Sequence, residues 1–493
     1  MSTARIHWIS GPVLRARVPA ASEGPFAMRE AVRVGPQGLL GEVVRLHGDE
    51  IAVQVYEDTT GLRPGMTLHG DGLPLAIPLG PGLLGRIFDG LLRPLAGLDS
   101  AFVAAGLRRG AAREFAFTPE VRAGERLGGG QVFGHVRGDA AERLAGLAGA
   151  AVEPPPQACL VPPDAAGDVV DIAPAGRYAD TQPLLTLRQA DGRERRIAMT
   201  HPWPVRTPRP VRARLASNAP LVTGQRVLDS LFPVALGGKA AIPGGFGTGK
   251  TVLLEALAKG ARADVIVYLG CGERGNEMAG VLEEFPQLVD PRTGGPLMQR
   301  TVVIANTSNM PVAAREASIY AAVTVAEYFR DQGLDVALMA DSTSRWAEAL
   351  REVSGRFGEL PGEGGYPAYL ASRIADFYER AAVVDTLAGA RGSVSILGAI
   401  SPPSGDFSEP VTSHTKRYVK AFGALDVKRA QARFYPAVHP LQSYAEDAEG
   451  FAAWWAAQGN ADWVALRRRF LTLLDDQARL ERMARIVGKD ALQ

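Results

Sequence analysis

The chain of 493 residues has room for two to four domains, at about 100–200 residues per domain. Its 53 acidic and 54 basic residues nearly cancel, so no overall charge favours nucleic acid or an anionic membrane. A 46% apolar fraction excludes a mostly disordered chain, and two cysteines exclude a disulfide scaffold. Because neither a signal peptide nor a membrane span is recognisable, we expect a soluble intracellular protein that meets membranes only through partners.

The first 75 residues consist of short β-branched segments separated by glycine and proline. Alternation over four to six residues with frequent turn signals predicts a small antiparallel β-barrel over residues 1–75. Glycine clusters, a proline run and further short strands then predict a separate β-rich insertion over residues 105–200. A proline-dense stretch, residues 201–210, follows it.

Between about residues 211 and 435 the pattern changes to strand, turn and helix in alternation. This order indicates a largely parallel sheet covered by helices, and we assign residues 76–104 and 201–435 to this α/β domain. Residues 436–493 form a short helical region. The predicted fold class is therefore multidomain α/β. The strand candidates are residues 265–269, 301–305, 336–340 and 393–399, and they alternate with helical stretches such as 312–330.

A glycine-rich loop in this domain fits the phosphate-binding pattern G-x-x-x-x-G-K-[ST]. Glycines let backbone N–H groups converge on a phosphate, and the next helix directs its positive end toward the same group. Lys250 would contact the β- and γ-phosphates, and the Thr251 hydroxyl would complete a Mg²⁺ shell. Only seven of the 54 basic residues are lysine, so a lysine here is seldom accidental. The loop and the first helical residues are Gly244, Gly245, Phe246, Gly247, Thr248, Gly249, Lys250, Thr251 and Val252.

Three further features lie downstream of the loop. The apolar run 335–340 ends in Asp341, which would hold Mg²⁺ through water or, alternatively, cap the next helix. The run 265–272 leads to Glu273 and Arg274. This pair would orient a water molecule and contact the γ-phosphate, or would form only a solvated ion pair. Tyr435 would stack on adenine or serve as a core aromatic before a turn.

Together these residues resemble the catalytic A subunit of the V/A-type rotary ATPases, members of the ATP synthase alpha/beta family. The likeness covers nearly the whole chain. The β-rich insertion resembles the one that A subunits have and the catalytic subunits of F-type enzymes lack. The family implies an N-terminal β-barrel and a P-loop, RecA-like core. The matching segments are residues 271–278, 305–320, 339–352, 361–370 and 405–412.

The resemblance also implies roles for single residues. Glu273 matches the glutamate that activates water, Arg274 an arginine near the γ-phosphate, and Arg345 an arginine bordering the catalytic pocket. Lys250 and Thr251 match the phosphate and Mg²⁺ positions, Asp341 the second-motif aspartate, and Tyr435 the aromatic that faces adenine. The implied cofactors are ATP or ADP and Mg²⁺.

The same resemblance implies an alternating hexamer of A and B subunits, with an arginine finger supplied in trans by B. Central rotor and peripheral stalks would couple ATP hydrolysis or synthesis to H⁺ or Na⁺ movement through a membrane sector, on the cytoplasmic face. The chain departs from the family pattern at Thr248 and in the basic stretch 416–418. It also ends at residue 493, where family members continue through further helices that touch the rotor.

Two other functions are consistent with a nucleotide-binding hexamer. One is a non-catalytic structural subunit, which has no need of a carboxylate at Glu273. The other is an export ATPase or an RNA translocase. The insertion at 105–200 argues against the export ATPase, and the near-zero net charge argues against the translocase.

Overall fold

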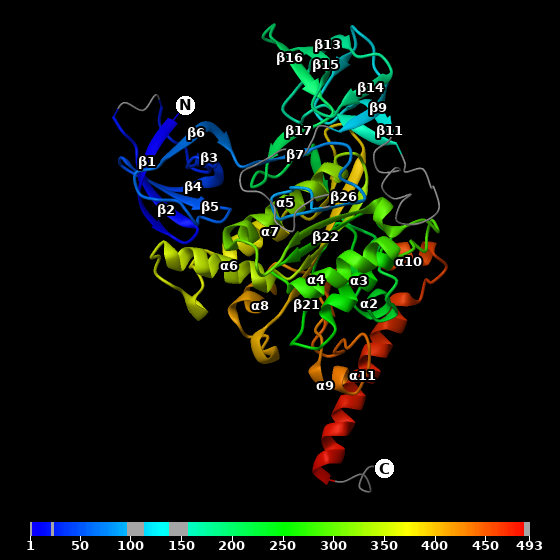
Figure 1. Cartoon of the computed structure of the whole chain (residues 1–493). Helices are drawn as coiled ribbons and strands as arrows, with labels where there is room; N and C mark the ends of the chain where they lie inside the picture. Colours follow the sequence, from blue (N-terminus) through cyan, green and yellow to red (C-terminus); the bar gives the residue numbers. More distant parts are fainter. Residues whose placement is uncertain (1, 21–23, 96–112, 138–155, 488–493) are drawn as a thin grey trace.

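The computed structural model describes residues 2–20, 24–95, 113–137 and 156–487. Figure 1 shows two β modules standing beside a central sheet wrapped by helices, with one long helix projecting at the C-terminal end. The predicted boundary between residues 104 and 105 lies outside the described residues.

The N-terminal module is a closed six-stranded barrel in the order β1-β2-β5-β4-β3-β6. Its strands alternate buried apolar and more exposed side chains, as expected when one face of a strand lines a core. Ile6, Leu14, Val32, Val53 and Leu68 fill that core. The predicted barrel is confirmed. Its strands are β1 (Ser2–Ser10), β2 (Val13–Arg17), β3 (Glu30–Val34), β4 (Leu39–His47), β5 (Glu50–Val55) and β6 (Thr67–Pro74).

The second β module consists of two four-stranded sheets around a separate core that contains Phe115, Phe117 and Phe133. It is joined to the rest of the chain near β17 (His201–Pro204), which pairs antiparallel with β7 (Ala76–Leu79). One sheet comprises β10 (Arg126–Leu127), β13 (Gly167–Ile172), β15 (Pro183–Arg188) and β16 (Glu194–Ala198). The other comprises β12 (Gln157–Leu160), β11 (Val132–Arg137), β9 (Glu114–Pro119) and β14 (Gly176–Ala179).

The central sheet has a parallel core in the order β21-β26-β24-β22-β23-β8. The strand β8 belongs to the segment that precedes the second β module and pairs with β23, so the chain leaves this sheet and later returns to it. The strand bounds are β8 (Arg86–Phe88), β21 (Lys239–Pro243), β22 (Val265–Cys271), β23 (Thr301–Asn306), β24 (Asp335–Asp341) and β26 (Arg391–Ile400).

Helices cover both faces of this sheet, which explains why its strands are continuous apolar runs rather than alternating ones. Along β22, Val267 and Leu269 pack with α5 and α6, whereas Ile266 and Tyr268 pack with α3. The predicted helix 312–330 is observed with those bounds. The covering helices are α3 (Lys250–Gly260), α4 (Gly275–Glu284), α5 (Val312–Arg330), α6 (Thr343–Arg356) and α7 (Leu370–Tyr378).

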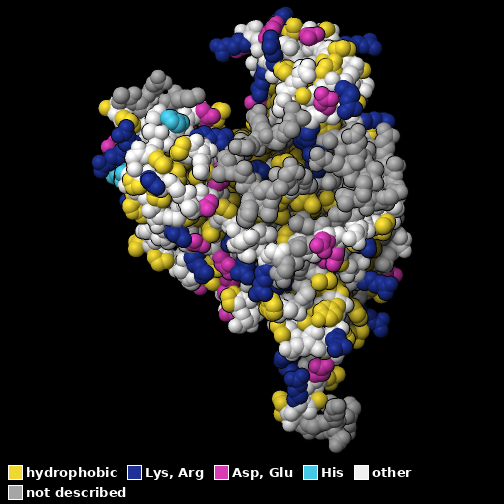
Figure 2. All heavy atoms as spheres, in the orientation of Figure 1, with side chains coloured by type: hydrophobic (Ala, Val, Ile, Leu, Met, Phe, Trp, Pro, Cys, Tyr) yellow, Lys and Arg dark blue, Asp and Glu magenta, His cyan; other side chains and the backbone are white. Residues whose placement is uncertain are grey.

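The C-terminal region is helical, as predicted, and consists mainly of α10 (Ala452–Ala457) and α11 (Trp463–Val487). Figure 2 shows hydrophobic side chains among charged ones along the projecting α11, where Leu466, Phe470 and Leu473 are exposed. Within the described ranges, no helix is both long and apolar enough to cross a bilayer.

Candidate functional site

The glycine-rich loop lies between the end of β21 and the start of α3, at the carboxyl edge of the parallel strands. Gly247 and Gly249 have φ angles of 77° and 83°, a conformation that side chains rarely adopt. A Cβ on Gly244 would lie 2.4 Å from the Thr248 hydroxyl oxygen, which itself donates to the Gly245 carbonyl at 2.8 Å. The loop is therefore a tight backbone cradle that opens on the first turn of α3.

Lys250, the first residue of α3, folds back over this cradle. Its ammonium donates hydrogen bonds to the carbonyls of Gly244 at 2.8 Å and Gly245 at 3.0 Å. These contacts hold the ammonium at the mouth of the loop. Backbone N–H groups of such a loop are suited to hold an anion, and the ammonium lies beside them.

Thr251 connects the loop to β24, which is separated from β21 in the sheet by β26. Its hydroxyl donates a 2.7 Å hydrogen bond to Asp341 Oδ2 at the end of β24, and Asp341 is only 1% exposed. The capping alternative for Asp341 is wrong, because Ser342 occupies the cap position of α6. The Thr251 hydroxyl and the Asp341 carboxylate, two oxygen ligands of the kind that Mg²⁺ prefers, are thus adjacent.

Glu273 emerges directly after β22, where the chain bends at Gly272 with a φ of 74°. A Cβ on Gly272 would lie 2.7 Å from Arg345 Cβ and 2.9 Å from Arg315 Cδ. This close approach brings the half-buried Glu273 toward the first turn of α6. Arg345 there forms an ion pair of 2.9 Å with Glu348.

Arg274 leans toward the glycine-rich loop. Its guanidinium lies 5.6 Å from the centre of the Phe246 ring, within the usual range of a cation–π contact. Phe246 is 85% exposed. The contact places the positive charge of Arg274 next to the loop.

Tyr435 lies beside the loop at Gly249, although the two residues are far apart in the sequence. A Cβ on Gly249 would stand 3.6 Å from the Tyr435 ring, whose hydroxyl donates to the Ala430 carbonyl at 3.2 Å. The ring is 63% exposed, so the alternative of a core aromatic is wrong. Val252 is also exposed, on the first turn of α3.

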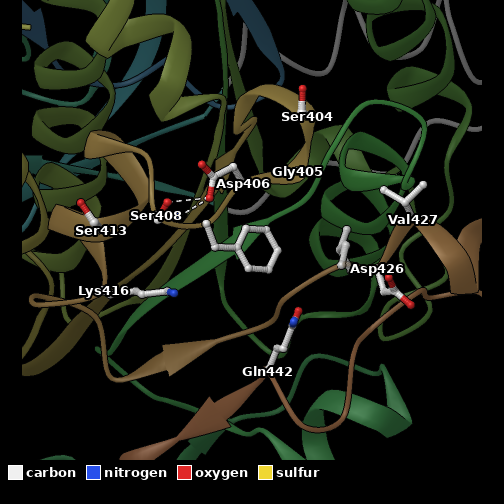
Figure 3. Close-up of a pocket in the computed structure, with 11 residues that line it drawn as sticks. Ser404, Gly405, Asp406, Ser408, Ser413, Lys416, Asp426, Val427 and Gln442 are labelled. Carbon is white, nitrogen blue, oxygen red and sulfur yellow. Dashed lines mark hydrogen bonds between the residues drawn. The ribbon is translucent and has the colours of Figure 1, made fainter. Parts of the chain in front are cut away.

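A cavity of about 730 Å³ adjoins the loop, but none of residues 244–252 lines it. Gly405 and Val427, in its wall, lie beside Gly245. In Figure 3, Lys416 and Gln442 point into this space. The Lys416 ammonium lies 5.0 Å from the centre of the Phe422 ring.

No motif predicted a role for Glu255, which lies one helical turn beyond Thr251. Burial, with the nearby carboxylates of Glu284 and Asp341, raises the pKa of Glu255 to about 7. Burial and Asp341 likewise raise the pKa of Tyr268. In the sequence, the only signal for Glu255 is its helical spacing from Thr251, which places both side chains on the same face of α3.

Cys271, by contrast, is fully buried, and burial raises its pKa to about 12. Such a thiol suits packing rather than nucleophilic chemistry.

Three family models match the chain. They describe the nucleotide-binding domain of the ATP synthase alpha/beta family at residues 224–445, its beta-barrel domain at 6–69, and, at 147–206, the barrel-sandwich domain of the alpha/beta subunit. The A subunit of the A-type ATP synthase of Desulfurococcus sp. (strain SY) is 50% identical over 99% of this chain and 82% of its own length. The chain belongs to the ATP synthase alpha/beta family.

Other relatives agree with this assignment. The A subunit of the A-type ATP synthase of Thermococcus kodakarensis is 51% identical, and the V-type ATP synthase alpha chain of Halothermothrix orenii is 49% identical. Each covers 99% of this chain, which in turn covers 82% and 81% of their lengths. The predicted function, the catalytic subunit of an ATP-hydrolysing, ion-translocating rotary ATPase, is confirmed.

The fold of this family member also resembles that of the assembled ATPase EscN of the enteropathogenic E. coli type III secretion system. The TM-score is 0.66, with 98% of this chain and 89% of EscN covered. Identity is only 22%, so this likeness concerns the fold alone.

Proposed function

We propose that this subunit binds ATP or ADP with Mg²⁺ at the loop formed by residues 244–249 and the first turn of α3. The observation that carries the proposal is the 2.7 Å hydrogen bond between Asp341 and Thr251, the residue that follows Lys250 on α3. Backbone N–H groups and Lys250 would hold the phosphates, and the Tyr435 ring and Val252 would face the base. Thr251 would ligate Mg²⁺ directly and Asp341 through water.

In this arrangement the metal would neutralise charge on the β- and γ-phosphates. Glu273, at the end of β22, would orient the attacking water and accept its proton. Arg274, held near the loop by Phe246, would approach the γ-phosphate, and Arg345 would border it from α6. These roles require the side chains to gather at one sheet edge, and Gly272 provides the close approach between the Glu273 turn and α6.

The subunit would act in an alternating hexamer with B subunits, which supply an arginine finger to each site. Through a central rotor stalk and peripheral stalks, turnover would be coupled to H⁺ or Na⁺ translocation by a membrane sector. We place the assembly on the cytoplasmic face of that membrane. Support comes from the relatives, which are named as subunits of A-type and V-type ATP synthases.

The variant Glu273→Gln tests the catalytic role. It retains volume and hydrogen bonding but cannot accept a proton, so we expect Mg-ATP binding to persist while hydrolysis by the hexamer reconstituted with B falls about 10²–10⁴-fold. Glu283→Gln on the exposed side of α4 is the matched control and should leave the rate unchanged. Near-normal single-turnover hydrolysis by Glu273→Gln would remove Glu273 from the mechanism.

A further inference from the structure

A second cavity lies between the N-terminal barrel and the helices α6 and α7. Its volume is about 130 Å³, several times the ~30 Å³ that one water occupies in the liquid. Arg29 and Gln54 contribute to its wall from the barrel, and Arg373 contributes from α7. The cavity is thus built by two parts of the chain that are far apart in sequence.

Gln54 brings an unused hydrogen-bond donor to this cavity. The residue is only 4% exposed, and its side-chain amide nitrogen has no hydrogen-bond partner among the described residues. A buried donor left unpaired has lost its hydrogen bonds to water without replacement, which is unfavourable. A ligand with acceptor atoms would remove that cost.

The carboxylates that line the cavity are already engaged. Glu316 accepts from Arg206 at 2.7 Å, and Glu359 accepts from Arg45 at 3.2 Å. Glu316 is buried, and Arg206 is the main partner that lowers its pKa against the effect of burial. Arg29 and Arg373 also lower that pKa, from beyond ion-pair distance. The wall carries Arg29, Arg45 and Arg373 against these two carboxylates, so positive charge remains in excess.

Arg373 makes no close ion pair in the described parts of the chain. Its guanidinium instead lies 5.6 Å from the Tyr369 ring centre. Arg29, opposite, has only a long contact of 3.5 Å with Glu42. The cavity thus combines positive charge with the unpaired N–H donor of Gln54.

We propose that this cavity binds a small tetrahedral oxyanion of the phosphate type. Guanidinium groups recognise such oxygens through paired N–H donors, and donors arriving from a barrel loop, a strand and a helix suit a tetrahedral acceptor. Arg373 and Arg29 supply the charge, and the Gln54 amide donates a hydrogen bond. The bound anion links the barrel to α7, independently of the glycine-rich loop.

Equilibrium dialysis of the full chain with radiolabelled inorganic phosphate tests the proposal. Because the glycine-rich loop also attracts phosphate, the measurement is made in the Lys250→Ala background. We expect one saturable site there, weakened at least tenfold by Arg373→Met and only partly restored by Arg373→Lys, which keeps the charge but not the paired N–H donors. Arg351→Met is the matched control, because Arg351 lies on α6 outside the cavity and its guanidinium likewise lies over a ring, that of Tyr366.

Gln54→Leu provides an independent variant should Arg373→Met fold poorly, and it too should weaken binding. Sulfate should compete with phosphate, whereas acetate at the same ionic strength should not. Absence of a saturable site in the Lys250→Ala chain would mean that the cavity holds water only and would overturn the proposal. Equal binding by all variants, or equal competition by acetate, would also overturn it.

Discussion

The Thr251 hydroxyl donates to Asp341 Oδ2 at 2.7 Å, which joins the first turn of α3 to the end of β24. These residues are 90 positions apart in the chain. Because parallel strands end at one edge of the sheet, the helix after the phosphate loop and a strand much later in the chain deliver their side chains to the same place. The metal site that we propose is therefore a product of strand order.

Thr251→Val should destabilise the chain even without nucleotide. The substitution keeps the shape of the side chain but leaves the buried Asp341 carboxylate without this donor, at a cost of about 1–3 kcal/mol. Thermal unfolding of the free subunit measures the effect. Thr251→Ser retains the hydroxyl and should unfold close to wild type, and equal destabilisation by both variants would contradict the hydrogen-bond explanation.

Lys250→Ala should weaken ATP binding without unfolding the chain. The lost charge-assisted contacts to phosphate should cost about 1.5–3 kcal/mol of binding free energy. Titration calorimetry with Mg-ATP measures this loss. Lys259→Ala, at the exposed far end of the same helix, should bind as wild type does. Unchanged affinity in Lys250→Ala would exclude the loop as the nucleotide site.

Glu255→Gln should make stability less dependent on pH. The folded-state pKa of Glu255 is about 7, above the ~4.3 of an unfolded chain, so the folded chain holds a proton that the unfolded chain has released between these values. The contribution of Glu255 to stability therefore declines as pH rises from about 4.5 to 7. The melting temperature of Glu255→Gln should exceed that of wild type by a margin that grows from pH 5 to pH 8. A margin independent of pH would contradict the assignment.

Arg380→Met should be among the most destabilising single changes. Arg380 pairs with Glu327 at 2.6 Å, and their side chains are 3% and 1% exposed. Removing one partner of a buried pair typically costs about 3–5 kcal/mol. Arg479→Met breaks an exposed pair with Asp476 on α11 and should cost less than ~1 kcal/mol. Similar melting temperatures for the two variants would show that burial does not strengthen the Arg380 pair.

The isolated subunit should bind Mg-ATP but hydrolyse it slowly. An arginine finger supplied in trans accelerates phosphoryl transfer about 10³–10⁵-fold in other systems. Phosphate release at saturating ATP, measured before and after titration with a cognate B subunit, should rise steeply. A lone chain that already works at the full rate would show that its site is complete without B.

The amino-acid sequence by itself determined the local features. The glycine pattern at 244–251 predicted the loop and the helix after it, and the alternation of strand, turn and helix predicted α5 with its observed bounds. The alternation in the first 75 residues predicted the barrel. Each of these depends on residues a few positions apart, for which backbone geometry and hydrophobic periodicity suffice.

Only the tertiary structure decided which distant residues meet. It placed the exposed Tyr435 ring beside Gly249, set Arg274 over Phe246, and surrounded Glu255 with other carboxylates. It also created the cavity between the barrel and α7, whose unpaired Gln54 amide no pattern could reveal. A pKa or an unsatisfied donor depends on burial and on neighbours brought together by strand order and domain packing, and the sequence carries no local signal for either.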